Sequence, residues 1–338
     1  MGLTPARMKI RAAWISITVA VVAVSAFLAY DRGYLRIGSN GLSDGGDKEQ
    51  RKQDRKKPMS GFAFDGGPFE SSGVASVPGT DAVLFVDDGR PAEIYWMQLD
   101  GSGRQTGAIK TIRLGIEIDD PEDLTTDGRY LYVVGSNTRE AEKRFGLARF
   151  VFDPSTNQVS TPSPIPNMRS LLVERVEELK DQGSKKANDD GLNIEGIAWD
   201  PDGRRLLLGL RSPVLSGQAL IVPIRVRDVD APFTIENLSI GESPTVRLSL
   251  DGLGIRSIQY DSKLKSYLII AGPTELQNKR EFSLWRWDGR AKVIRVAMLD
   301  PEMKPEGVTR MRVGDADFIL VIGDSNRYVR LEDIEERK

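Results

Sequence analysis

The sequence contains neither cysteine nor histidine. The absence of thiols rules out disulfides, and the absence of both residues removes the usual zinc ligands and the thiol and imidazole groups of nucleophilic catalysis. A Ser-His-Asp triad is therefore excluded. Any catalysis has to use carboxylates, lysine, arginine, tyrosine, hydroxyls or a metal ion held by oxygen atoms.

An excess of one charge is also missing. The 47 Lys and Arg residues are nearly balanced by 49 Asp and Glu residues, which gives a net charge of −2 and argues against nucleic acid as a partner. The 338 residues include 33 Gly and 18 Pro, with 40% hydrophobic residues. This composition is typical of a turn-rich globular protein with a sizeable core, in one large all-β domain or two ordinary domains.

The first 30 residues have the pattern of a membrane anchor. Basic residues (Arg7, Lys9 and Arg11) precede an uncharged, mostly apolar run from Ala12 to Tyr30. As a helix this run spans about 28 Å, close to the roughly 30 Å hydrocarbon core of a bilayer. The basic flank predicts a single-pass protein whose following domain lies outside the cytoplasm, periplasmic or at the cell surface. A cleaved signal peptide, with Val24-Ser25-Ala26 as its small-residue site, is the alternative and predicts a secreted protein.

Residues 31–58 are rich in Gly, Ser, Asp, Gln and basic residues and end in a basic block, Arg51 to Lys57. Such a segment buries too little apolar area to offset its ordering entropy, so we expect a flexible linker. A charged tail is expected over 334–338. The folded domain is therefore predicted over 59–333.

The clearest pattern in that domain is a β-hairpin within Gly191 to Pro213. A Glu195-Gly196 pair opens a short β-type run, an Asp-Pro-Asp-Gly turn reverses it, and Leu206 to Leu208 lead back to a polar end at Arg211. Four further hairpins follow the same plan at intervals of about 50 to about 70 residues. The first of them opens at Ser72 and ends at Asp87-Asp88, and the second opens at Glu122 and ends at Ser136-Asn137. The third opens at Arg256 and ends at Pro273-Thr274, and the last opens at Glu306 and ends at Asp324-Ser325-Asn326.

A third β-type run follows each hairpin, and a fourth follows most of them. Antiparallel four-stranded units repeated radially make a β-propeller. We therefore predict an all-β propeller with five blades, or six if the long middle segments conceal another. The last unit lacks its own fourth strand, and Gly61 to Phe64 is expected to supply it and close the ring. The third runs are Ile94–Leu99, Leu147–Phe152, Ala219–Val226, Phe282–Trp287 and Tyr328–Leu331, and the fourth runs include Ile109–Leu114, Val246–Leu250 and Val293–Leu299.

One segment near 167–190 interrupts the repeats. Apolar residues recur at helical spacing from Ser170 to Lys180, which predicts a short amphipathic helix with Ser170 as its N-cap. We expect this helix to pack on the side of the propeller, with a lid over the channel mouth as the alternative.

The hairpin geometry predicts a functional face. The start of the first strand and the end of the second lie at the same end of an antiparallel hairpin, so these positions ring one face if the first strands line the central channel. We call it the channel face and predict that a ligand or partner binds there. The candidate binding residues are Glu122, Glu195, Glu306, Asp87, Asp324, Arg211 and Arg256.

Carboxylates that face one another across a narrow channel repel unless a cation offsets them, which leaves two alternatives. In the first, Ca²⁺ or Mg²⁺ is bound by oxygen ligands among Glu122, Glu195, Glu306 and Asp324, with Asp87 also available. Such a metal ion would activate water or polarise an ester or phosphoryl oxygen. In the second, Arg211 and Arg256 neutralise the ring by ion pairs, and no cofactor is needed.

The run Asn193–Leu220, together with Ser72-Gly73-Val74 and Pro305-Glu306-Gly307-Val308, resembles an uncharacterised bacterial propeller family known as domain of unknown function 3616. More distantly it is similar to esterase-like phytase and gluconolactonase or regucalcin propellers. The first resemblance implies a fold without an established activity. The second implies a divalent cation in the channel and hydrolysis of an ester, lactone or phosphate. Glu195, Glu306 and Glu122 match the acidic openings of those relatives, and Arg256 and Ser72 depart from them.

Together these patterns predict a membrane-tethered, extracytoplasmic β-propeller that binds a ligand or protein partner at its channel face. The alternative is a Ca²⁺- or Mg²⁺-dependent hydrolase that uses the channel carboxylates.

Overall fold

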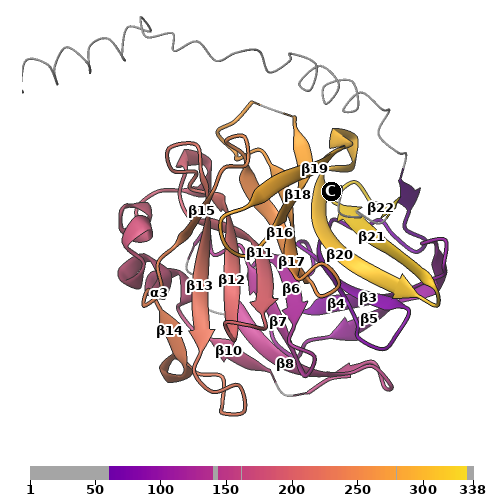
Figure 1. The fold of residues 1–338 in the computed structure, drawn as a ribbon. Helices are drawn as coiled ribbons and strands as arrows, with labels where there is room; N and C mark the ends of the chain where they lie inside the picture. The colour runs from indigo at the N-terminus through magenta and orange to yellow at the C-terminus, as the bar shows by residue number, and fades with distance from the viewer. Residues whose placement is uncertain (1–60, 140–143, 161, 279, 333–338) are drawn as a thin grey trace, which may run out of the picture. The chain divides into compact units, whose positions relative to one another are not determined.

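Five antiparallel sheets of four or five strands follow one another along the chain, which confirms the predicted five-bladed propeller (Figure 1). The computed structural model describes residues 61–139, 144–160, 162–278 and 280–332. The predicted anchor and linker (1–58) and the charged tail (334–338) lie outside the described residues. Within the described ranges no helix has the length and apolar character needed to cross a membrane.

Blades 1, 2 and 3 are built from consecutive segments of the chain. Blade 1 has the order β2-β3-β4-β5, with bounds Ser71–Ser76, Ala82–Asp87, Glu93–Leu99 and Gln105–Arg113. Blade 2 has the order β6 (Pro121–Thr126), β7 (Tyr130–Gly135), β8 (Leu147–Asp153) and β10 (Ser163–Ile165). The short strand β9 (Gln158–Val159) also pairs with β8. Blade 3 has β11-β12-β13-β14, and β15 also pairs with β13; the bounds are Asn193–Asp200, Arg205–Ser212, Ala219–Val226, Leu238–Ile240 and Val246–Leu248.

Blade 4 has the order β16-β17-β18-β19, with bounds Gly254–Asp261, Ser266–Gly272, Phe282–Trp287 and Val293–Leu299. Blade 5 has β20 (Pro305–Val313), β21 (Ala316–Gly323) and β22 (Arg327–Glu332), and its fourth strand is β1 (Phe62–Ala63) from the start of the described chain. Short 3₁₀ helices lie between strands at η3 (Ile235–Asn237) and η4 (Pro301–Met303).

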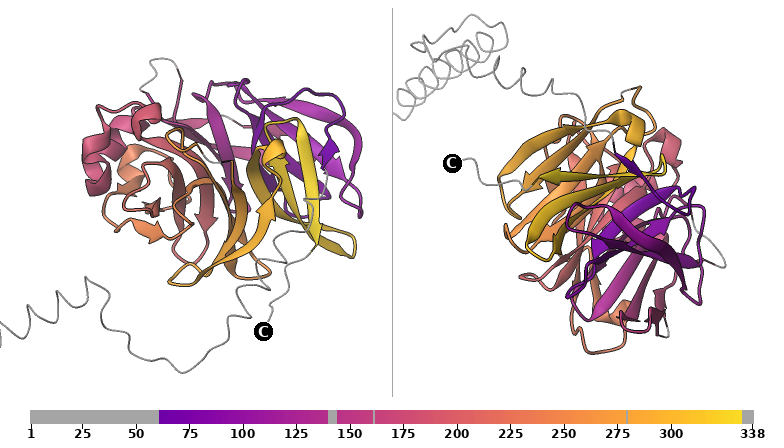
Figure 2. Two further views of the ribbon diagram at one scale, coloured as in Figure 1. Left: turned by 90° about the horizontal axis from the view of Figure 1, so that it is seen from above. Right: turned by 90° about the vertical axis from the view of Figure 1, so that its right-hand side faces the viewer.

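The blades close into a ring. Each first strand contacts the first strands of both neighbouring blades, in the order β2, β6, β11, β16, β20 and back to β2. The packing of the sheets around a common axis can be followed in the two views of Figure 2. Five apolar clusters of buried residues fill the five interfaces between adjacent blades. Burial of one Leu, Ile, Val or Phe side chain contributes about 1.5–3 kcal/mol to the stability of the fold. Because each interface has its own cluster, all five interfaces contribute to that stability.

The predicted closure of the ring is confirmed. Phe62 and Ala63 of β1 pair with Tyr328 and Arg327 of β22. Phe64, which follows β1, is buried, and its ring centroid lies 5.2 Å from that of Phe85 in blade 1. The start of the domain therefore holds blade 5 against blade 1.

The helical insertion differs from its prediction. Helix α3 spans Met168–Arg175, begins after Asn167 rather than Ser170, and is followed by the 3₁₀ helices η1 (Glu177–Gln182) and η2 (Ala187–Asp189). Val176 breaks the predicted helix because its backbone is extended, with φ −101° and ψ 115°, which lets its side chain join the core between blades 2 and 3. The insertion thus packs on the side of the propeller, where α3 contacts β14.

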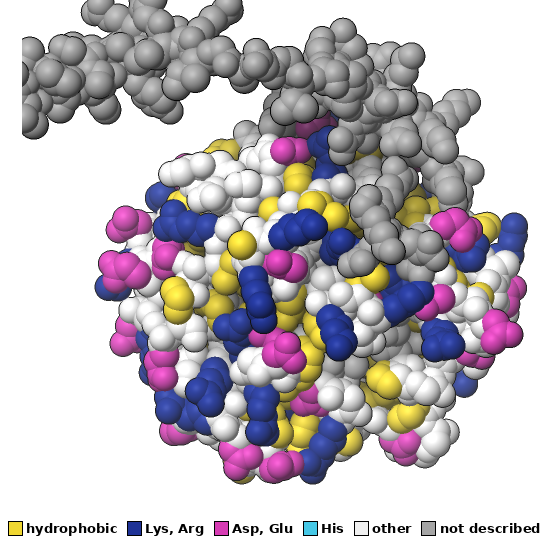
Figure 3. Space-filling model, viewed as in Figure 1, with side chains coloured by type: hydrophobic (Ala, Val, Ile, Leu, Met, Phe, Trp, Pro, Cys, Tyr) yellow, Lys and Arg dark blue, Asp and Glu magenta, His cyan; other side chains and the backbone are white. Residues whose placement is uncertain are grey.

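On the face seen in Figure 3, Lys and Arg side chains are interspersed with Asp and Glu rather than gathered by sign.

Candidate functional site

Each first strand carries a β-bulge at its opening. The pairing register skips one residue at Glu122, Glu195, Arg256 and Glu306, and a matching skip falls within Ser72-Gly73 of blade 1. A bulged residue is left out of the ladder, and its side chain is re-aimed. The bulges therefore direct the opening side chains of the blades toward one another at the channel face.

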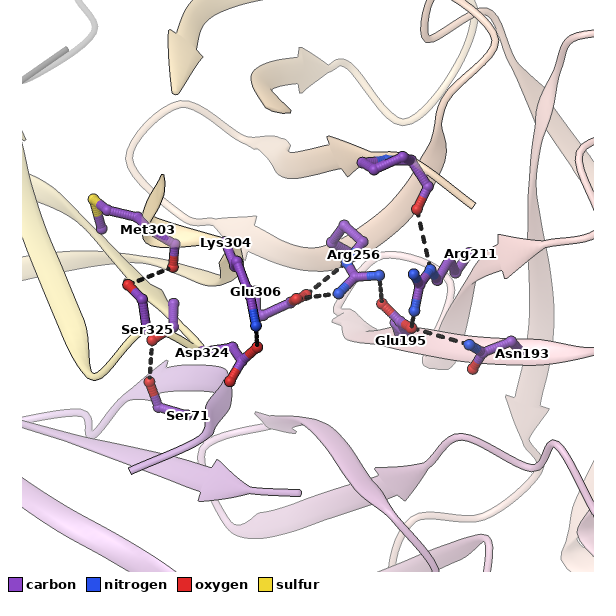
Figure 4. A network of polar contacts seen from close by, with 12 residues as sticks. Ser71, Asn193, Glu195, Arg211, Arg256, Met303, Lys304, Glu306, Asp324 and Ser325 are labelled. Atoms are coloured by element: carbon purple, nitrogen blue, oxygen red, sulfur yellow. Dashed lines mark hydrogen bonds and ion pairs between the residues drawn. The ribbon is translucent and has the colours of Figure 1, made fainter. Parts of the chain in front are cut away.

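The centre of the channel face, which we call the hub, is filled by ion pairs (Figure 4). The guanidinium of Arg256 lies between two carboxylates: its Nε is 2.6 Å from Glu306 Oε2, and its Nη1 is 2.9 Å from Glu195 Oε2. Arg211 Nη1 donates to Glu195 Oε1 at 2.8 Å, and Asn193 Nδ2 donates to the same oxygen at 3.0 Å. Glu195, Arg256 and Glu306 are all buried.

Two hub carboxyl groups have raised pKa values. Burial raises the pKa of Glu306 to about 7, although Arg256 opposes this shift. Burial, with the nearby charges of Glu195 and Asp120, holds the pKa of Glu122 well above its ordinary value. Both shifts show that burial disfavours the charged form of these groups, which Arg256 opposes.

A group of carboxylates lies beside the hub, and we call it the acidic rim: Glu70, Asp87 and Asp88. One carboxylate oxygen from each lies within 4.8 Å of the others. Burial, followed by the charges of Glu70, Asp120, Asp324 and Asp87, raises the pKa of Asp88 to about 7. Both causes act in the same direction, because burial and neighbouring negative charges each disfavour an ionised carboxylate.

Between the rim and the hub lies an ion pair from blade 5. Lys304 Nζ contacts Asp324 Oδ2 at 2.5 Å, just before the opening of β20 and after the end of β21 (Figure 4). The pKa of Lys304 is raised by this bond and by the charges of Asp324, Glu306 and Glu70. The channel face thus continues from blade 3 through the hub to blade 1.

A fully buried carboxylate, Asp123, fills the channel below the hub. It accepts hydrogen bonds from the backbone N–H groups of Ile197 (3.1 Å) and Leu124 (2.8 Å) and from the Ser257 hydroxyl (3.1 Å). Burial raises its pKa well above the ordinary value against these bonds. Blades 2, 3 and 4 are therefore tied together at the axis.

Gly73, Gly196 and Gly307 follow the opening residues of blades 1, 3 and 5, and their missing side chains leave room for the groups at the axis. A Cβ on Gly73 would lie 2.0 Å from Asp123 Oδ1, and a Cβ on Gly307 would lie 2.5 Å from the Ser72 carbonyl oxygen. The second position of the opening is Gly in blades 1, 3 and 5 but Asp123 and Ser257 in blades 2 and 4. This departure from the repeat is the signal in the sequence that could have identified Asp123, which the sequence analysis missed.

The predicted site residues fall into two groups. Glu195, Glu306, Arg211 and Arg256 meet in the hub, and Glu122 lies close enough for its charge to couple to theirs. Asp87 belongs to the acidic rim, and Asp324 is paired with Lys304 beside it. Reasoning from the hairpin ends placed Asp88 at the end of the first hairpin. It did not assign a role to Glu70, Asp120, Asn193 or Lys304, because three of them precede a strand and Asn193 lies two residues before the expected opening.

The hub does not have the chemistry of a divalent cation site. Both oxygens of Glu306 and both oxygens of Glu195 face guanidinium groups. Arg256 lies between the two carboxylates, in the position that a metal ion bound by both of them would occupy. The acidic rim has a donor set that fits better, because Ca²⁺ and Mg²⁺ prefer carboxylate oxygens and three are close together.

Comparison with known proteins begins from the sequence. Residues 178–335 match the model of a family described as a protein of unknown function, DUF3616. No curated protein matches the chain.

Among solved structures, hydrazine synthase from Kuenenia stuttgartiensis is 13% identical with a TM-score of 0.35, over 78% of this chain and 58% of that chain. A structural genomics protein of unknown function from Bacteroides thetaiotaomicron is 11% identical with a TM-score of 0.39, over 78% of this chain and 55% of that chain. The chain therefore spans less than two thirds of the length of both structures. Residues 178–335 hold blades 3 and 4 and the strands β20, β21 and β22 of blade 5. Over these residues the chain carries the sequence pattern of the DUF3616 family, as the Glu195 and Glu306 motifs predicted.

Proposed function

We propose that this protein is a binding propeller that takes a cationic ligand, in its simplest form a divalent metal ion, at the acidic rim of the channel face. The observation that carries the proposal is the convergence of three carboxylate oxygens from Glu70, Asp87 and Asp88 within 4.8 Å. Burial is the main cause of the raised pKa of Asp88, and a bound cation would offset the contribution of the neighbouring negative charges.

The arrangement around the rim supports binding from solution. Asp87 is buried and its Oδ1 accepts a hydrogen bond from the Gly89 N–H at 3.0 Å, so its position is set by the backbone. Asp88 is half-buried and Glu70 is exposed. One fixed and two accessible carboxylates leave open positions around a Ca²⁺ ion, which takes six to eight oxygen ligands.

The hydrolase alternative has less support. It would place the metal ion on Glu195, Glu306 and Glu122, and the first two of these are held by arginines. The hub is better explained as a neutralised plug, which is the second of the alternatives raised by the sequence. We therefore favour binding over hydrolysis.

The test uses the full-length protein with CaCl₂ and, separately, MgCl₂ as probes. Millimolar Ca²⁺ should raise the melting temperature by mass action, and titration calorimetry should show one saturable site. The variant Asp88→Asn should lose both effects. Asp81→Asn, which makes the same charge change at an exposed position of the same blade on the turn side, should keep them.

If neither cation changes the melting temperature of the wild type, the proposal fails. It also fails if Asp81→Asn removes the response as completely as Asp88→Asn, because the effect would then come from overall charge rather than from the rim.

We also propose that residues 12–30 tether this binding domain to a membrane with the propeller outside the cytoplasm. The length of the apolar run and its basic flank support this. The full-length protein should stay in the membrane fraction after a high-salt wash and leave it in detergent. Release by salt alone would contradict the tether.

A further inference from the structure

A second candidate site lies at the other end of the propeller. A cavity of about 760 Å³ opens among the reversing turns of blades 1, 4 and 5. Its walls come from the β2–β3, β16–β17 and β20–β21 hairpins, at the ends of the first strands opposite the hub. This volume lies within the range of about 300–1,000 Å³ typical of small-molecule sites.

The charges along one wall of the cavity alternate and balance when Asp261, which is buried beside the lining residues, is included. Arg310 Nε contacts Asp261 Oδ2 at 2.7 Å, and Arg310 Nη1 contacts Asp317 Oδ1 at 2.6 Å. Asp317 Oδ2 is in turn 3.0 Å from Lys263 Nζ. Two bases therefore match two acids, and Arg312 and Asp315 add one charge of each sign to the lining.

The cavity also offers an aromatic side chain. Tyr260 is half-buried, and its ring meets that of Tyr267 edge-on with centroids 5.3 Å apart, which fixes its orientation. Tyr260 lines the cavity, and among the described residues its hydroxyl forms no hydrogen bond. Met311 is buried behind the wall and adds apolar surface.

We propose that this cavity binds a neutral, hydroxyl-rich ligand of the carbohydrate class. A charged ligand would have to break an existing ion pair or leave a charge uncompensated at a partly desolvated site. A sugar hydroxyl can donate to Asp317 and accept from Lys263 or Arg310, so it adds hydrogen bonds without disturbing the charge balance. The Tyr260 ring provides a flat surface for the C–H face of a sugar ring, and its hydroxyl provides a further donor.

The experiment is titration calorimetry of the full-length protein with neutral di- and trisaccharides, a linear polyol, a matched uronic-acid disaccharide and inorganic phosphate. A neutral sugar or the polyol should bind saturably, and comparison of the two distinguishes a cyclic saccharide from an open-chain ligand. Tyr260→Ala should weaken binding by about tenfold or more, equivalent to about 1.4 kcal/mol. Tyr260→Phe keeps the aromatic ring and should weaken sugar binding less than Tyr260→Ala does. Binding that persists in Tyr260→Phe also shows that the cavity is still folded.

A charge variant gives an independent readout. Asp317→Asn leaves Lys263 and Arg310 with one carboxylate fewer, so it should shift the preference from the neutral disaccharide toward the uronic-acid disaccharide. Asp189→Asn, which makes the same charge change at an exposed position of the side insertion outside the cavity lining, should leave sugar binding unchanged. Saturable binding of phosphate or the uronic acid in preference to neutral ligands by the wild type would overturn the proposal, as would no binding of any neutral ligand.

Discussion

At the scale of the residue, Arg256 decides the character of the channel face. The repeat places a glutamate at this opening in three of the five blades, whereas blade 4 has an arginine. That single exchange supplies a buried cation to Glu195 and Glu306. It turns a ring of repelling carboxylates into a paired network and leaves the acidic rim as the part of the face with unbalanced negative charge.

Removing Arg256 should be costly. Arg256→Leu leaves Glu195 and Glu306 buried beside each other, and breaking a buried pair typically costs about 3–5 kcal/mol. Urea denaturation should show this loss in the free energy of unfolding. Arg227→Leu, which breaks a pair with Glu242 in which both side chains are more than half exposed, should cost about 0–1 kcal/mol. Similar losses in the two variants would contradict the role of Arg256.

Asp88 should make stability depend on pH. Its pKa is about 7 in the folded protein and near 3.8 in the unfolded chain, so the folded state binds more protons between these values. Its contribution to stability is therefore present below about pH 4 and is lost as pH rises to about 7. In the presence of EDTA, the wild type should lose stability over this interval relative to Asp88→Asn. Parallel pH profiles for the two proteins would show that Asp88 titrates normally.

At the scale of the element, the first strands depend on glycines that let blades approach at the axis. A Cβ on Gly73 would lie 2.3 Å from Asp123 Cα, which is backbone and cannot move without displacing β6. Gly73→Ala should therefore lower the free energy of unfolding by about 1–3 kcal/mol or more. Gly101→Ala, whose nearest new contact is at 3.7 Å, serves as the control and should change stability little. Chemical denaturation of both variants measures the difference.

The strands and the insertion show where local patterns succeed and fail. The third strands of blades 3 and 4 have the predicted bounds, Ala219–Val226 and Phe282–Trp287, because their β-branched and aromatic residues end at clear turn signals. The helix predicted over 170–180 is instead split at Val176. Its helical periodicity could not reveal that Val176, Leu172 and Leu179 are drawn into a core that blades 2 and 3 provide.

At the scale of the whole molecule, the ring is closed by residues from the two ends of the described chain. A truncated protein that begins at Phe69 would lack β1 and Phe64 and would leave the edge of β22 unpaired. Loss of the buried Phe64 side chain alone should cost about 1.5–3 kcal/mol, and the open edge should promote aggregation. Thermal melting and light scattering measure both effects.

The matched control is a protein that begins at Gly61, which keeps β1 and Phe64. If the two truncated proteins melt at the same temperature and scatter equally, closure by β1 does not contribute to stability.

The sequence by itself determined the repeating hairpin and the strand that closes the ring, because these follow from local turn chemistry, β propensity and periodicity. It favoured five blades over six, and the structure decided for five. It also placed Glu195, Glu306, Arg211 and Arg256 at corresponding ends of their hairpins. Only the tertiary structure decided which charges pair, since the bulges and the spacing of the blades set distances between residues that are 16 to 61 positions apart, from Glu195 and Arg211 to Glu195 and Arg256. The same holds for the turn-side cavity, which exists only where separate blades meet. The acidic rim lies within blade 1, where the pairing of β2 with β3 brings Glu70 beside Asp87 and Asp88.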